Sequence, residues 1–331
     1  ERLVHTEEVT GSIPVSPTAM SSREGCAAGG VCAARSPPPP RRTIPRPPRH
    51  PRCQLSAARR RLIVSQYDHP MSPTDSETAV SAAEAAAQVH RSWVGSDLGR
   101  RWKSGADFAT EVDTAAENAI LAVVRSQRPD DAVIAEESGR SGPRDAERVW
   151  FVDPLCGTLN YAAGEGPYGA SVALTQGDDV LAAAVAEPHR LTWTNGAEAF
   201  IRVSGHDEPA APSASSRIVE ILMETVDPDE QGFSSARFWR SSAFQTLSPR
   251  FVGTGIALAW VATGLRAGLV LPGRRQTSVH FSSGIGICRA AGCVLTGLRG
   301  EPLHLCHDGL VCAADAATHA LLLAGVAEQL G

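Results

Sequence analysis

From residue 74 onward, apolar residues alternate between helical and strand-like spacing, and no other feature limits the range of folds as strongly. An Ala-rich run at 74–93 and an apolar stripe over 112–123 predict two helices. Short apolar runs at 132–135 and 149–152 predict strands, the second halted by Asp153 and Pro154. Further strands are expected at 170–174 and 180–185, and further helices at 254–265, 282–291 and 313–330. The pattern therefore predicts a mixed α and β (α+β) protein.

The first 70 residues lack this periodicity. Residues 1–70 contain 11 of the 23 prolines, and 11 arginines against five acidic residues. A segment with so little apolar content cannot offset its ordering entropy, so we expect a disordered leader. One hypothesis is a basic arm for an acidic partner. The other, which we favour, is that the leader is not native protein and that Met71 is the natural start, because residues 5–15 resemble the chance translation of a tRNA gene.

The rest of the chain is expected to form two connected halves, 71–205 and 217–331, separated by a stretch rich in Ser, Pro and Ala. Residues 71–331 carry 20 basic and 31 acidic residues, a net charge of −11, which disfavours a nucleic-acid partner. No apolar run reaches 18 residues, so no membrane span is predicted.

The eight cysteines form no regular framework, which favours reduced thiols and a cytoplasmic location. A metal cluster is conceivable at one place near the C-terminus, but its spacing matches no standard zinc site. Its members would be His304, Cys306, His307 and Cys312.

Two predicted strands end at carboxylates, Glu136 and Asp153. Strand ends are where mixed α/β proteins place their sites, because the backbone there is fixed while side chains face a crevice. After Asp153, Gly157 lets the backbone approach a ligand closely, and a helix starting near Thr158 would offer free N–H groups to an anion. The local pattern predicts hard oxygen ligands for a divalent cation beside a phosphate cradle. The alternative is that these carboxylates are turn residues.

Three motifs occur in order along this part of the chain. Residues 103–113 read KSGADFATEVD, residues 135–138 read AEES, and residues 150–161 read WFVDPLCGTLNY. Together they strongly resemble the inositol monophosphatase family, and residues 169–174, 261–264 and 284–295 extend the match. The resemblance covers essentially all of residues 71–331.

The resemblance implies a layered αβαβα sandwich and metal-dependent hydrolysis of small phosphate monoesters. Members of this family typically use Mg2+, are often inhibited by Li+ and are often dimers, so a homodimer is expected. Carried over to this sequence, the first metal ion would be bound by Glu136, Asp153 and the backbone carbonyl of Leu155. A bound metal ion lowers the pKa of its water and neutralises charge on the phosphoryl oxygens.

The same resemblance assigns the remaining roles. Thr158 and Glu136 would orient the attacking water, Asp113 would support Thr158, and Gly157 and Thr158 would offer N–H groups to the phosphate. Attack would be in line, with no phosphoenzyme. Other interpretations are that Asp113 only caps a helix and that Glu137 is a solvated neighbour.

The sequence departs from the family at the second metal site, which shares Asp153. Cys156 stands where the family has the second aspartate of Asp-Pro-(Ile/Leu)-Asp-Gly-Thr, and His280 where it has the aspartate of Trp-Asp-x-Ala-Ala-Gly. Leu271 aligns with the acidic residue that usually contacts the inositol ring, which argues against inositol itself. Because Mg2+ prefers oxygen ligands, the second site is expected to be altered.

Three outcomes follow from this departure. The second site is empty and a slower one-metal enzyme remains; or Asp153, Cys156 and His280 bind Zn2+, Mn2+ or Fe2+; or catalysis is lost and the protein is a phosphate-ligand binding or partner module. The first is our default. The expected activity is a phosphatase acting on a sugar, inositol or nucleotide monophosphate.

Overall fold

In the computed structural model, residues 73–96, 98–104, 107–223, 232–273, 278–305 and 308–330 are described. The chain divides into two compact units, Glu1–Gln66 and Tyr67–Gly331, and every described residue lies in the second. The leader 1–70 therefore lies outside the described residues, and the expectations for it stay predictions.

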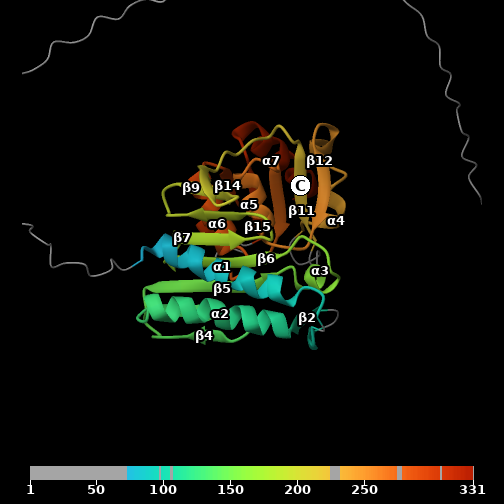
Figure 1. The fold of residues 1–331 in the computed structure, drawn as a ribbon. Coiled ribbons are helices and arrows are strands. Elements are labelled where there is room, and N and C mark those ends of the chain that lie inside the picture. Colours follow the sequence, from blue (N-terminus) through green and yellow to red (C-terminus); the bar gives the residue numbers. More distant parts are fainter. Residues whose placement is uncertain are drawn as a thin grey trace, which may run out of the picture. The chain divides into compact units, whose positions relative to one another are not determined.

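The second unit consists of two stacked β-sheets with helices on both outer sides and between them (Figure 1). Helices α1 (Asp75–Trp93) and α2 (Glu111–Gln127) share one apolar cluster with the first sheet. Helices α5 (Ala257–Ala262) and α6 (Ser282–Ala291) share a second cluster with strands of both sheets. Helix α7 (Ala316–Leu330) packs with α4 (Ser235–Phe238) on the far side of the second sheet. The predicted αβαβα sandwich is confirmed.

The first sheet has eight strands. Only β3 and β5 are parallel neighbours; the other pairs are antiparallel. In spatial order the strands are β10 (His206–Pro209), β9 (Ala199–Val203), β8 (Leu191–Thr194), β7 (Asp179–Ala186), β6 (Gly169–Gln176), β5 (Arg148–Cys156), β3 (Ala132–Ala135) and β4 (Gly139–Ser141). Its central strands have helices on both faces and are therefore apolar along their length rather than alternating: Val172 and Leu174 of β6 face α1 and α2, and Ala173 faces the middle layer.

The second sheet has five strands and continues the sandwich beyond the middle helices. In spatial order they are β12 (Ser248–Val252), β11 (Ile218–Leu222), β13 (Gly268–Pro272), β15 (Gly309–Ala313) and β14 (Val294–Thr296). A separate two-stranded sheet, β1 (Arg100–Ser104) with β2 (Asp107–Thr110), leads directly into α2. A short helix, α3 (Thr158–Ala162), follows β5.

Both N-terminal helices begin at capping boxes. Thr74 and Glu77 exchange hydrogen bonds at the start of α1, and Thr110 and Asp113 do so at the start of α2. These caps satisfy N–H groups that a helix leaves without partners, and they fix where each helix begins. The predicted helix starts are therefore confirmed to within a residue.

The prediction that Asp153 and Pro154 halt a strand is wrong. Strand β5 continues to Cys156, and its register against β6 shifts between Asp153 and Cys156. Proline cannot donate to a ladder, but at such an irregularity the ladder needs no donor. The strand therefore bends at the proline instead of ending there, and the carbonyl of Pro154 accepts a hydrogen bond from the buried ring of His90 on α1 at 2.8 Å.

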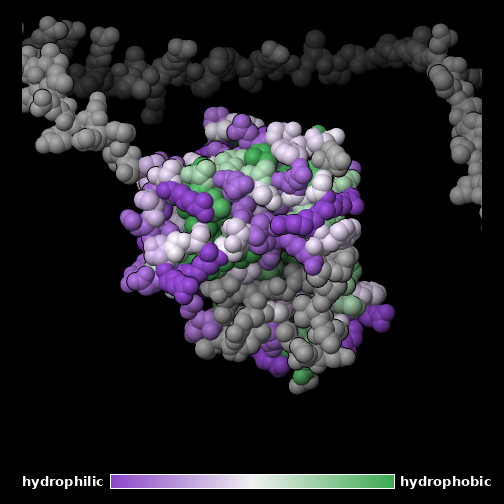
Figure 2. Space-filling view, turned by 90° about the horizontal axis from the view of Figure 1, so that it is seen from below, coloured by the Kyte–Doolittle hydropathy of each residue, from purple (hydrophilic) through white to green (hydrophobic). Residues whose placement is uncertain are grey.

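No described helix combines the length and the apolar character needed to cross a membrane. On the face drawn in Figure 2, hydrophilic side chains cover most of the described surface and hydrophobic side chains are scattered among them. The large apolar side chains are mostly inside, in the clusters that join the layers.

Candidate metal and phosphate site

The parallel pairing of β3 and β5 brings the two predicted metal-binding carboxylates to the same end of the sheet. Ala135 pairs with Val152, and the backbone N–H of Glu136 donates to the carbonyl of Val152 at 3.0 Å. Glu136 directly follows Ala135 and Asp153 directly follows Val152, so the two carboxylates extend from neighbouring backbone positions. Burial, and then the charge of Asp153, raise the pKa of Glu136 to about 8, although His280 and Lys103 act in the opposite direction.

Asp153 is completely buried, and its two carboxylate oxygens have different surroundings. Oδ2 lies 2.7 Å from Nδ1 of His280. Oδ1 has no hydrogen-bond partner among the described residues. A buried carboxylate oxygen without a partner is costly, and a bound cation would remove that cost.

The backbone around Leu155 provides further oxygen. The hydroxyl of Thr158 lies 3.0 Å from the carbonyl of Leu155 and 2.9 Å from Oδ1 of Asp113. Oδ2 of Asp113 accepts from both the N–H and the hydroxyl of Thr110, at 2.7 and 2.6 Å. Asp113 therefore caps α2 and also reaches Thr158, so the two interpretations of this residue are compatible. Burial raises the pKa of Asp113.

Gly157 has a conformation that favours glycine. Its φ is +97°, and a Cβ there would lie 2.5 Å from the carbonyl oxygen of Pro167. The same carbonyl accepts from the side-chain amide of Asn160 at 2.8 Å. Gly157 thus lets the chain turn sharply from β5 into α3, and Thr158 is the first residue of that helix. The phosphate role of these two residues stays a prediction.

Sequence reasoning missed Lys103. Its amine lies 2.8 Å from Oε1 of Glu136 and 2.6 Å from Oε1 of Glu137. Burial opposes its charge, but the hydrogen bonds to both carboxylates outweigh burial and raise the pKa of Lys103. The available signal was that Lys103 is the one lysine in a sequence whose other basic residues are arginines.

The expectation that Glu137 is solvated is wrong. Its side chain is 5% exposed and pairs with both Lys103 and Arg101. The backbone N–H of Glu137 also donates to Glu117 of α2 at 2.8 Å. The β1–β2 hairpin carries both cations over the end of β3, and the local sequence around Glu137 could not reveal that contact.

The two substituted positions do come together. Ligand atoms of Asp153, Cys156 and His280 all lie within 4.8 Å of one another. The thiol sulfur of Cys156 accepts from the hydroxyl of Thr254 at 3.0 Å and from the N–H of Gly255 at 3.2 Å. Burial, and then the charge of Asp153, raise the pKa of Cys156 to about 11. Burial lowers the pKa of His280, but its hydrogen bonds to Asp153 and Cys156 outweigh burial and raise it to about 11.

Two other sequence expectations concern Leu271 and the C-terminal metal cluster. Leu271 cannot contact a ligand at this site, because it lies in β13 with 0% exposure, packed in the middle layer. Leu271 is therefore a core residue of an apolar strand, although its position in the sequence aligns with an acidic residue of the family. Of the C-terminal metal cluster, Cys306 and His307 lie outside the described residues.

The donors at the end of β3 and β5 suit a hard divalent cation. Glu136 and Asp153 offer carboxylate oxygens and Leu155 a carbonyl oxygen, which is the donor chemistry that Mg2+ prefers. The unpartnered Oδ1 of Asp153 and the raised pKa of Glu136 both indicate negative charge that the described side chains do not fully neutralise. The residues present therefore fit a bound divalent cation.

Comparison with known proteins identifies the family of the chain. A glucose-1-phosphate thymidylyltransferase of Streptomyces griseus is 36% identical over 152 residues, which are 44% of this chain and 58% of that protein. The inositol-1-monophosphatase ImpA of Mycolicibacterium smegmatis is 32% identical over 216 residues, which are 60% of this chain and 73% of that protein. An inositol monophosphatase structure from Anabaena shares the fold, with a TM-score of 0.61 at 23% identity, over 75% of this chain and 94% of that one. The sequence profile of the inositol monophosphatase family matches residues 73–330. This chain therefore belongs to the inositol monophosphatase family.

Proposed function

We propose that this protein hydrolyses a small phosphate monoester, of a sugar, an inositol or a nucleotide, with one divalent cation bound by Glu136, Asp153 and the carbonyl of Leu155. The observation that carries the proposal is the buried Oδ1 of Asp153, which has no partner among the described residues, beside the partly buried carboxylate of Glu136. Lys103 and His280 offset this pair only in part, because the pKa of Glu136 is still raised, and a divalent cation between the two carboxylates would stabilise both. Mg2+ is the proposed cofactor, and when bound it supplies charge neutralisation and a water of lowered pKa.

The hydroxyl of Thr158 positions the attacking water. It has one proton, which it donates to Oδ1 of Asp113 or to the carbonyl of Leu155. Its oxygen is then free to accept a hydrogen bond from a water, which turns a lone pair of that water toward the phosphorus. Asp113 is fixed in turn by two hydrogen bonds from Thr110, so it acts as a positioning residue. The carboxylate of Glu136 accepts a hydrogen bond from the other O–H of this water.

The second metal position is proposed to be without an ion in the working enzyme. Nδ1 of His280 lies 2.7 Å from Oδ2 of Asp153, so each of these two atoms already has the other as a partner in place of a metal ion. Cys156 is engaged by Thr254 and Gly255. Loss of the second ion removes stabilisation of the leaving group, so we expect a slow enzyme.

Phosphate release by the full chain tests the proposal. We expect release from at least one member of a phosphomonoester panel with Mg2+, and a loss of about a thousandfold in Asp153→Asn, because removing a metal ligand costs several kcal/mol of transition-state stabilisation. Asp145→Asn, which changes an exposed aspartate, is the matched control. The proposal fails if no phosphate is released with Mg2+, Mn2+ or Zn2+. A substrate-induced rise in the thermal midpoint without turnover would instead support the binding-module alternative.

A double substitution tests the one-metal part of the proposal separately. Cys156→Asp with His280→Asp restores the family's carboxylates, and the donors of Thr254 and Gly255 that now contact the sulfur are placed to receive a carboxylate. We expect the Mg2+-dependent rate to increase at least tenfold. A decrease would mean that Cys156 and His280 serve a softer metal ion, and the one-metal assignment would then be wrong.

A further inference from the structure

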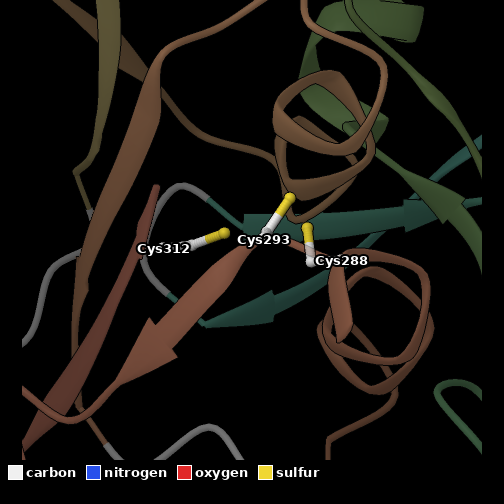
Figure 3. A group of neighbouring side chains, drawn as sticks. All are labelled: Cys288, Cys293 and Cys312. Carbon is white, nitrogen blue, oxygen red and sulfur yellow. The ribbon is translucent and has the colours of Figure 1, made fainter. Parts of the chain in front are cut away.

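A second group of possible ligands lies away from the site described above. Cys288 is in the last part of α6, Cys293 follows that helix, and Cys312 is in β15. Their sulfur atoms all lie within 4.8 Å of one another. Figure 3 shows the three side chains converging from these separate elements. The sequence spacing of these cysteines matches no standard zinc motif, so the cluster is visible only in the folded chain.

We infer that Cys288, Cys293 and Cys312 form a binding site for a soft d10 cation, Zn2+ or Cu+, which is distinct from the catalytic cation. All three sulfur atoms can bind one ion, because they lie within 4.8 Å of one another. A Zn–S bond of about 2.3 Å places tetrahedral sulfur ligands roughly 3.8 Å apart, so the cluster needs to contract by no more than about 1 Å. No carboxylate or imidazole belongs to the group among the described residues, and thiolates select soft cations over Mg2+.

The burial of the three side chains supports a site with an entry path. Cys288 and Cys312 are both 0% exposed, whereas Cys293 is partly exposed. A cation can therefore reach the cluster past Cys293, and solvent on that side can supply a fourth ligand to Zn2+. Around the other two thiols the surroundings are apolar, with Leu269 and Leu295 paired to Cys312 on either side. Exclusion of water there protects a metal–sulfur bond from competing ligands.

Cys288, Cys293 and Cys312 are all free thiols. The thiol of Cys288 donates to the carbonyl of Leu258 in α5 at 3.1 Å, so this sulfur carries its proton. Binding of a cation would replace the S–H bonds with S–metal bonds and release those protons to solvent. No oxidant is needed, because sulfur keeps its oxidation state.

Occupancy of this site would fasten the C-terminal part of α6 to β15. The N-terminal end of α6 begins at Ser282, two residues after His280, which contacts Asp153. A cation at the three cysteines would therefore hold one end of the helix whose other end adjoins the proposed active site. The expected consequence is higher stability of the middle layer, because a ligand that binds only the folded state raises its melting temperature.

Metal analysis of the full chain tests the inference. Cys26, Cys32 and Cys53 are first replaced by serine, so that thiols of the leader do not contribute. The reduced protein is then equilibrated separately with Zn2+, with Cu+ under anaerobic conditions and with Mg2+, and dialysed. We expect one equivalent of Zn2+ or Cu+ to be retained at this site, with a rise of several degrees in the thermal midpoint, and no such effect of Mg2+.

Two substitutions assign the bound ion to these thiols. Cys293→Ser, at the partly exposed position, should lose the bound equivalent and the rise in midpoint while the protein stays folded. Cys156→Ser is the matched control. It removes the thiol that lies beside Asp153 and His280, so the equivalent of metal ion at the three cysteines should be retained. Retention unchanged in Cys293→Ser, absence of binding by both ions, or a disulfide between two of these cysteines in protein isolated under reducing conditions would overturn the inference.

Discussion

The carboxylates of Asp153 and Asp131 differ in their hydrogen-bond partners. Asp131 also lies in the first half of the domain, but its two oxygens accept from Arg148 and from the indole of Trp150. Such a carboxylate is fully partnered and stabilises the fold. Oδ1 of Asp153 has no partner among the described residues, although the residue is completely buried. Unfavourable groups of this kind occur where function requires them, so this oxygen supports the proposed metal site more strongly than the position of Asp153 in the sequence does.

Gly157 gives a prediction at the same scale. Gly157→Ala should lower the free energy of unfolding by about 2–4 kcal/mol, because the methyl group adds a clash with the Pro167 carbonyl to the strain of a positive φ. Gly164→Ala is the control: φ there is +82° but no atom lies within 4 Å of the new Cβ, so only about 1 kcal/mol is expected. Denaturant titration of both variants measures the difference. Equal losses would mean that the close approach at Gly157 has no energetic consequence.

At the scale of elements, the sequence predicted what local interactions determine. The starts of α1 and α2 follow from capping boxes whose partners are three residues apart, so the pattern was readable. The passage of β5 through Pro154 was not readable, because it depends on an irregularity in pairing with β6. Likewise the motifs proposed Glu136, Asp153, Asp113 and Thr158 as site residues, whereas the contacts of Lys103 depend on how a separate hairpin folds over β3.

The contact between α1 and β5 predicts a dependence of stability on pH. His90 is 2% exposed, and burial lowers its pKa to about 4, although the carbonyl of Pro154 and the charge of Asp153 oppose this. Between pH 6.5 and 4 the unfolded chain therefore binds a proton that the folded chain does not. Stability should fall by up to about 3 kcal/mol as pH decreases through this window.

The variant His90→Gln isolates that effect. It removes the titrating group but keeps a donor for the Pro154 carbonyl, so its stability should vary less with pH between 6.5 and 4 than that of the wild type. His206→Gln, at an exposed position on β10, should retain the wild-type slope. Denaturant unfolding at several pH values gives the comparison. If His90→Gln and the wild type lose stability in parallel, another group is responsible for the acid sensitivity.

At the scale of the whole folded unit, the two sheets are joined by one shared helix layer. α6 lies so close to its neighbours that a side chain would clash at two of its positions. A Cβ on Gly284 would lie 2.5 Å from Cβ of Leu258 in α5, and a Cβ on Gly286 would lie 2.4 Å from Cγ1 of Val180 in β7. The middle layer also packs against β13 of the second sheet. Because both sheets bury their inner faces on the same helices, we expect them to unfold together.

Gly286→Ala tests this coupling. Alanine gains up to about 1 kcal/mol of helix propensity, but overpacking against Val180 costs about 1–3 kcal/mol, so a net loss of about 1–2 kcal/mol is expected. Native-state hydrogen exchange followed on peptides from β6 and from β13 should show the same loss in both sheets, although the substitution contacts only the first. Gly253→Ala, where no atom lies within 4 Å, should change stability by less than about 0.5 kcal/mol. A loss of protection confined to β6 would mean that the two sheets open independently. A cation bound at the three cysteines would then not stabilise the proposed site at Asp153 through α6.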